Sequence, residues 1–319
     1  MKRFKYITGG IAIAVALALG SCESYLDVNE NPNSPTEAPI AQVLTNVTVN
    51  TGFRNGSDLH RYTSLIAQQF DGQGADGTQS REYARYLIQP SDVNTMYNNF
   101  FAVALADIDY IISKSQGHPH YSGVAKILKA YTYSQAVDVW GDLPFSEAMQ
   151  GTKNPQPKVD DDAAIYPELI KLINEGIAEI KAAQSNSSPG INETIYRGDR
   201  AKWEKFANTL KLRLFLHYSE KDPAFAKAQM DALINSGAPF MAANSDNFEM
   251  TFFDAASAQN SIHQFEVSRP DQFFPNKFMV DLMNTKVDPR RSSYFTDFPF
   301  NSGQYKGSRA TETQSFAYS

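Results

Sequence analysis

Apolar residues recur at steps of three and four through most of the chain after Pro39, which is the spacing of one face of an α-helix. Between Ser91 and Gly117 they form a wide stripe, with Ser91 suited to cap the start and Gly117 to stop the end. A second stripe covers residues 124–139 and breaks at residues 141–144. We therefore predict two helices that pack as an antiparallel hairpin.

The same spacing predicts three further helices, over residues 165–180, 203–217 and 223–237. Aspartates stand directly before them as caps, in the run Asp160 to Asp162, at Asp199 and at Asp222. One helical hairpin cannot bury its own apolar face, so pairs in series predict a tetratricopeptide-like array. The strict repeat consensus is not visible, and the array rests on periodicity. The predicted fold is mainly α: tetratricopeptide-like helix pairs form an α-superhelical scaffold with irregular ligand-binding loops.

The chain changes character after Gly237. Residues 240–248 have the composition of a loop, short irregular or β-leaning pieces follow, and one more helix is predicted over residues 276–284. The last thirty residues are rich in Ser, Thr, Gly and aromatics and show no helical stripe.

The N-terminus has the pattern of a secretory signal. Three basic residues in the first five are followed by an unbroken apolar run over residues 11–19, and small residues lead to Cys22, the single cysteine of the chain. Nine residues would span only about 14 Å as a helix, against a hydrocarbon core of about 30 Å, which disfavours a transmembrane helix. A structural thiol is disfavoured too, because a Pro/Asn-rich stretch follows.

This start resembles the lipobox of bacterial lipoproteins, in which the cysteine is acylated after cleavage. The resemblance implies that Cys22 is the site of lipid attachment and holds the protein on a membrane. We therefore expect residues 1–21 to be a lipoprotein signal peptide, residues 22–39 a tether, and residues 40–319 a helical binding domain.

The charge balance argues against nucleic acid as a partner. The whole chain carries a formal charge of −6, and without the leader 26 basic residues face 35 acidic ones, giving about −9. Nucleic-acid binding depends on clustered Lys and Arg. A lone cysteine allows no disulfide within the chain and no cysteine-based zinc site.

The sequence has no recognised catalytic or cofactor motif. It lacks a nucleophile elbow and a phosphate-binding glycine loop, and its five histidines show no metal-ligand spacing. The run Asp160 to Asp162 lacks the spacing of a calcium loop, so we interpret it as a helix cap. We predict no enzyme activity, no metal and no cofactor. A glycosidase carboxylate pair stays open, because such pairs are defined by distance in space.

Three stretches occur in a specific order after the lipobox. A Gly-Asp-x-Pro turn occupies residues 141–144, a W-x-x-F-A-N helix start occupies residues 203–208, and an Asp-Pro-Arg turn occupies residues 288–290. Together they resemble the SusD/RagB family of nutrient-binding outer-membrane lipoproteins, in its SusD-like branch. The motifs themselves predict scaffold roles: Gly141 ends a helix, Trp203 lies on a buried face, and Arg290 pairs with an acid on a neighbouring helix.

The resemblance implies a location and partners. Such proteins are anchored on the outer membrane by lipid and face the cell surface, and they pass an oligosaccharide or peptide to a SusC-like TonB-dependent transporter. Members commonly run beyond this length, so we expect the chain to be truncated at its C-terminus. The ligand, and the loops that contact it, stay open.

Loops of mixed polar and aromatic character are the best candidates for ligand contact, because stacking and a few hydrogen bonds hold sugars and peptides. The first segment is residues 71–86, a glycine-flexed loop, and the second is residues 260–271. The candidate ligand residues are Asp76, Arg81, Tyr83, Arg85, Tyr86, His263 and Arg269.

Two other functions compete with nutrient binding. A lipid-anchored glycan or peptide hydrolase is disfavoured by the missing nucleophile and metal signatures. A structural tetratricopeptide adaptor would bind a membrane partner tightly and small ligands not at all.

Overall fold

The structure is a computed structural model, and it describes residues 37–72, 78–270 and 272–309. Contacts between residues divide the chain into residues 1–39 and residues 40–319. The described helices and strands all lie in the second unit.

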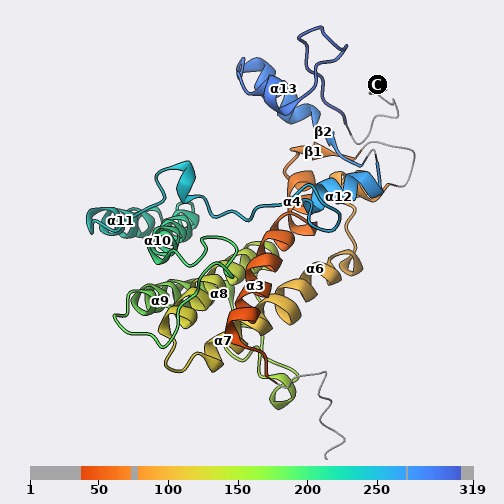
Figure 1. Cartoon of the computed structure of the whole chain (residues 1–319). Helices are drawn as coiled ribbons and strands as arrows, with labels where there is room; N and C mark the ends of the chain where they lie inside the picture. The colour runs from red at the N-terminus through yellow and green to blue at the C-terminus, as the bar shows by residue number, and fades with distance from the viewer. Residues whose placement is uncertain (1–36, 73–77, 271, 310–319) are drawn as a thin grey trace, which may run out of the picture. The chain divides into compact units, whose positions relative to one another are not determined.

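The second unit is mainly helical (Figure 1). Its elements in chain order are α3 (Ile40–Asn55), α4 (Asp58–Ile66), β1 (Phe70–Asp71), α5 (Gln79–Ala84), η2 (Pro90–Val93), α6 (Asn94–Asn98), η3 (Asn99–Leu105), α7 (Ala106–Lys114), α8 (Pro119–Trp140), η4 (Gly151–Lys153), α9 (Asp162–Ile180), α10 (Arg200–His217), α11 (Pro223–Asn235), η5 (Asn244–Asp246), α12 (Ser261–Ser268), β2 (Phe274–Pro275), α13 (Lys277–Thr285) and α14 (Arg291–Tyr294).

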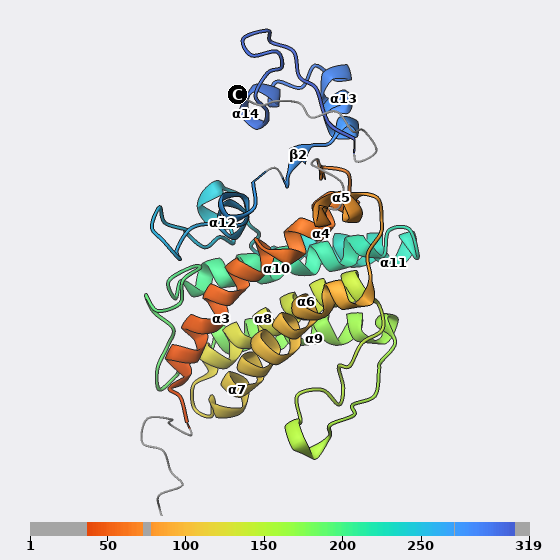
Figure 2. The ribbon, with the colours of Figure 1, turned by 90° about the vertical axis from the view of Figure 1, so that its right-hand side faces the viewer.

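Consecutive helices pack side by side, as the periodicity predicts. α7 lies against α8, α8 against α9, α9 against α10 and α10 against α11 (Figure 2). α3 completes the group by packing on α7 and α8. The core between them is apolar and includes the buried residues Leu44, Phe100, Ile108, Ile127, Leu128, Ile173, Trp203 and Leu214.

The predicted helix starts are confirmed by their hydrogen bonds. Asp161 accepts a bond from the backbone amide of Ala163, and Asp199 accepts bonds from Ala201 and Lys202. Asp222 caps α11 in the same way. Gly141 ends α8 with φ of +71°, which glycine adopts without a steric penalty.

Glu193 organises the connection between α9 and α10. Its carboxylate is fully buried and accepts bonds from the backbone amides of Ile195, Tyr196 and Gly198 and from the indole N–H of Trp203. The predicted burial of Trp203 is confirmed, and its indole nitrogen is satisfied by this carboxylate.

Three sequence expectations are corrected. The helix predicted from Ser91 contains a π-helical stretch, η3, which widens the backbone spiral between α6 and α7. The loop predicted over residues 71–86 contains helix α5, and the segment 260–271 contains helix α12. Arg290 pairs with Asp288 in its own turn, with Nε 2.9 Å from Oδ1, and not with an acid on a neighbouring helix.

None of the helices within the described ranges has the length and apolar character needed to cross a bilayer.

Candidate ligand-binding pocket

A short ladder of backbone hydrogen bonds brings three distant segments together. β1 pairs with β2 in antiparallel register, with Phe70 opposite Pro275 and Asp71 opposite Phe274. On the other side, Asn276 forms a parallel bridge with Ser308. The ladder therefore joins residues near 70, 275 and 308, which makes a frame for the site.

Helix α13 begins directly at this frame. The side chain of Asn276 accepts a bond from the amide of Phe278, and the amide of Lys277 donates to the carbonyl of Ser308 at 2.8 Å. A Cβ on Gly307 would lie only 2.4 Å from the Cα of Lys277, so a glycine is required where these two backbones meet.

The C-terminus of α5 forms a Schellman motif. The amide of Leu87 donates to the carbonyl of Glu82, and the amide of Tyr86 donates to the carbonyl of Tyr83, both at 2.9 Å. Tyr86 takes the left-handed position of the motif, with φ of +61°. A glycine usually occupies it, because a side chain there costs about 1–2 kcal/mol.

Tyr86 stays exposed in this conformation. Its hydroxyl donates to the carbonyl of Ile66 at 3.2 Å, and Gln68 donates to the same hydroxyl at 3.4 Å. The side chain is 58% exposed. Strained residues are enriched at functional sites, so the surface beside Tyr86 is a candidate functional site.

That surface is a pocket of about 700 Å³ between the end of α5 and the exposed face of α13. Ligand pockets in proteins commonly measure about 300–1,000 Å³. The pocket is lined by Gln68, Ala84, Arg85, Tyr86, Asn276, Lys277, Phe278, Asp281, Leu282, Thr285 and Arg309. The lining combines exposed aromatic rings, apolar side chains and charged side chains.

Positive charge predominates in the lining. Arg85, Lys277 and Arg309 face a single acid, Asp281, which pairs with Lys277 at 2.5 Å. Across the described part of the chain, the guanidinium of Arg85 has no ion-pair partner. The lining can therefore offer a free cation next to an aromatic ring.

The structure separates the candidates of the first segment. Arg85 and Tyr86 line the pocket, whereas Arg81 and Tyr83 are buried and are not part of its lining. Burial, together with the 3.1 Å hydrogen bond between the hydroxyls of Tyr62 and Tyr83, raises the pKa of Tyr83 above its usual range. Arg81 and Tyr83 thus support the site from within, and the expectation that they lie on an exposed loop is wrong.

The two predicted segments meet through Arg61 of α4. Its guanidinium carbon lies 5.6 Å from the ring centre of Tyr83 and 4.9 Å from that of Phe265 on α12. His263 and Arg269 are exposed on and just after α12, and the pocket lining does not include them. The guanidinium of Arg269 stacks on Phe265 at 5.5 Å instead.

Two further predicted residues lie outside the described residues: Cys22 and Asp76. The sequence did not predict that α13 and residues 307–309 take part in forming the pocket. Phe278 and Leu282 are one turn apart and exposed, while Val280 and Met283 are buried, so α13 is apolar on two faces. An unexplained second apolar face on a short helix was the available signal.

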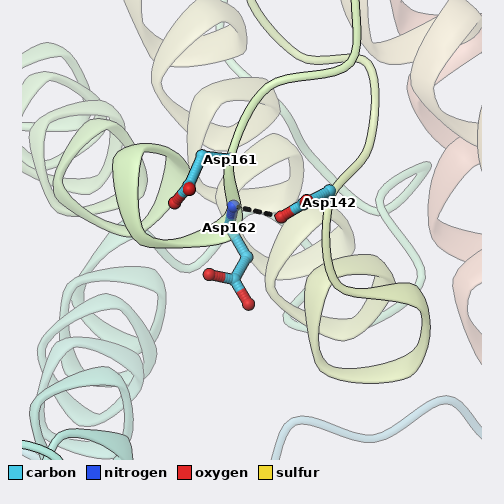
Figure 3. A group of neighbouring side chains, drawn as sticks. All are labelled: Asp142, Asp161 and Asp162. Carbon is cyan, nitrogen blue, oxygen red and sulfur yellow. Dashed lines mark hydrogen bonds between the residues drawn. The ribbon is translucent and has the colours of Figure 1, made fainter.

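The acidic run before α9 remains a capping device. Asp142, Asp161 and Asp162 place carboxylate oxygens within 4.8 Å of one another on the surface (Figure 3). Asp161 already caps α9, and Asp142 accepts a bond from the amide of Asp162 at 2.9 Å. The sequence interpretation of this run as a cap is confirmed for Asp161.

Two other surface cavities differ in character. One of about 430 Å³ is largely apolar and is lined by Phe53, Ile191, Met250, Phe252 and Phe253 among others. Another of about 780 Å³ lies along η3 and α7 and is lined mainly by small and apolar residues. The pocket at α5 and α13 is the one that holds two predicted ligand residues.

Sequence comparison identifies the family. The profile of the SusD-like family described as "Starch-binding associating with outer membrane" matches residues 32–319. The chain belongs to this SusD-like family. No curated protein matches the chain significantly.

Solved SusD-like structures share the fold. A SusD/RagB family protein from Bacteroides thetaiotaomicron superimposes with a TM-score of 0.71 at 22% identity, over 80% of this chain and 53% of that one. A chitin-binding protein gives 0.67 at 25% identity, over 80% and 54%. A chitin-binding SusD homolog from Flavobacterium johnsoniae gives 0.67 at 21%, over 82% and 57%.

The chain thus spans about half the length of these SusD-like structures. The mainly helical, SusD-like fold predicted from sequence is confirmed. The family is a family of binding proteins associated with the outer membrane.

Proposed function

We propose that this protein captures a glycan at the bacterial cell surface and delivers it to a TonB-dependent outer-membrane transporter. The observation that carries the proposal is the pocket in which Arg85 and Tyr86 meet the exposed face of α13. Its volume, exposed rings and charged side chains suit the stacking and hydrogen bonding by which proteins hold sugars.

A glycan is favoured over a peptide by the relatives. The family description refers to starch, and two structural neighbours are described as chitin-binding. The chain has only two tryptophans, Trp140 and Trp203, and both belong to the scaffold. Tyr86 and Phe278, at 58% and 62% exposure, are therefore the rings that would stack on a sugar.

Attachment through Cys22 completes the proposal. A capture protein must stay beside its transporter, and an acylated cysteine after a cleaved leader would keep it there. Labelling of the wild-type protein with a fatty acid analogue, lost in Cys22→Ala together with membrane partitioning, is the expected result. Partitioning unchanged in Cys22→Ala would contradict the anchor.

The proposed protein binds its ligand without cleaving it, whereas the alternative function is that of a hydrolase. Asp138, Tyr166 and His217 do cluster, with the Tyr166 hydroxyl 2.5 Å from Asp138 Oδ1 and 2.8 Å from His217 Nδ1. Burial and the bond to Asp138 raise the pKa of Tyr166, so the phenol stays protonated and is a poor nucleophile. We interpret the cluster as a link between the ends of α8, α9 and α10.

The test is a panel of glycans and peptides offered to the chain without its leader. We expect saturable binding of at least one glycan and no product release on long incubation. Release of shortened chains would favour the hydrolase, and tight binding to a membrane protein with no binding of any glycan would favour the adaptor.

A further inference from the structure

We infer that the pocket at α5 and α13 selects an acidic oligosaccharide, one whose rings carry carboxylates or sulfate esters. The inference rests on the proposed function, which makes the pocket a glycan site, and it adds the class of glycan.

The sign of the pocket is opposite to that of the protein. The chain has a formal charge of −6, yet the described lining contains three cations and one acid. The ion pair of Lys277 with Asp281 removes one charge of each sign, and Arg85 is left as a cation of the lining that forms no ion pair with the described residues. A local positive region on an acidic protein attracts anions selectively, because the surrounding field repels them elsewhere.

Arg85 is the best placed anion ligand. It follows the last residue of α5, and its side chain is exposed in the pocket. A guanidinium can donate two parallel hydrogen bonds to one carboxylate or sulfate, which gives geometric selection as well as attraction.

The neighbouring rings supply the apolar half of the recognition. Tyr86 follows Arg85 in sequence, and Phe278 faces the same pocket from the first turn of α13. A sugar acid has an apolar ring face and a charged edge, and a cation beside exposed rings matches both. The left-handed backbone of Tyr86 fixes the direction of this ring relative to Arg85.

The experiment measures the affinity of the chain without its leader by calorimetry at low salt. The ligands are an oligogalacturonate, the same oligomer with its carboxyl groups reduced to alcohols, a sulfated galactan oligomer and a polyglutamate peptide. We expect the oligogalacturonate or the sulfated oligomer to bind at least about tenfold more tightly than the reduced one, with the difference shrinking as salt is added.

Two variants test whether Arg85 provides the preference for the acidic glycan. Arg85→Gln should weaken binding of the acidic glycan by about ten- to a hundredfold and leave the reduced glycan nearly unchanged. Lys171→Gln removes an exposed cation from α9, away from the pocket lining, and should change neither affinity. Both side chains are exposed, so both variants should fold, and circular dichroism checks this.

Each failure has a distinct meaning. Equal affinity for the acidic and reduced glycans, or an Arg85→Gln protein that still prefers the acidic one, would overturn this inference and leave the proposed function standing. Polyglutamate binding as tightly as the acidic glycan would also overturn it. Failure to bind any glycan would overturn the proposed function as well.

Discussion

The contact between α8 and α9 depends on two facing glycines, Gly123 and Gly176, and replacing either with alanine tests this packing. A Cβ on Gly123 would lie 2.7 Å from the carbonyl oxygen of Gly176 and 2.8 Å from the amide nitrogen of Ile180. A Cβ on Gly176 would lie 2.8 Å from the carbonyl oxygen of Gly123. These neighbours are backbone atoms and cannot rotate away.

Two opposing effects decide whether alanine at Gly123 or Gly176 stabilises or destabilises the protein. Alanine is favoured over glycine inside a helix by about 0.8–1 kcal/mol. Relief of the clash requires the helices to separate by more than about 0.5 Å, which forfeits a quarter or more of the dispersion energy of the side chains between them. Ile127 and Ile180 are fully buried at this contact, and overpacking of such a core costs about 1–3 kcal/mol.

We expect Gly123→Ala to lower the free energy of unfolding by up to about 2 kcal/mol in urea titrations followed by circular dichroism. The double variant with Gly176→Ala should lose less than the sum of the singles, because one separation relieves both clashes.

Gly52→Ala is the matched control. Gly52 is also inside a helix, α3, but its added Cβ would meet side-chain atoms of Met250, with Cε at 2.7 Å, Sδ at 2.9 Å and Cβ at 3.0 Å, and the two shortest contacts involve the flexible end of that side chain. We expect it to be neutral or to stabilise by up to about 1 kcal/mol. A Gly123→Ala protein as stable as Gly52→Ala would refute the close approach of α8 and α9.

Glu193→Ala leaves four N–H donors, two buried and two partly buried, without an acceptor and should cost about 3–5 kcal/mol in urea titration, whereas the exposed Glu168→Ala should cost little. Burial would raise the pKa of Asp160, but hydrogen bonds from Ser146 and its neighbours outweigh burial and hold the pKa at about 2. Asp160→Asn should therefore destabilise the protein at neutral pH. The difference in unfolding free energy between this variant and the wild type should vanish as the pH falls from about 4 to 2. Tyr86→Gly should raise stability by up to about 1 kcal/mol by relieving the left-handed backbone, yet weaken glycan binding.

Much of the scaffold could be predicted because its signals are local. The helices from α8 to α11 follow from apolar spacing, and aspartates at 161, 199 and 222 mark the starts of α9, α10 and α11. The π-helical stretch η3 was missed because its apolar residues fit a regular α-helix equally well. Helix α12 was missed because it is short and has no residue in the buried core.

The site could be predicted only in part because most of it is assembled over long distances. Arg85 and Tyr86 were chosen for their type, and they do line the pocket. Arg81 and Tyr83 are of the same residue types but are buried, because the segment predicted as a loop contains helix α5, which has a buried face. Lys277 and Arg309 reach the pocket through backbone bonds between residues 275–277 and 308, which no local pattern reveals.

Hydrogen exchange of the chain with and without a saturating glycan tests whether the glycan binds in the pocket at α5 and α13. Capture at the pocket predicts slower exchange of the amides in residues 84–87 and 277–285, with little change elsewhere. Protection confined to residues 191–197 and 250–258, around the apolar cavity, would place the ligand there and contradict the account.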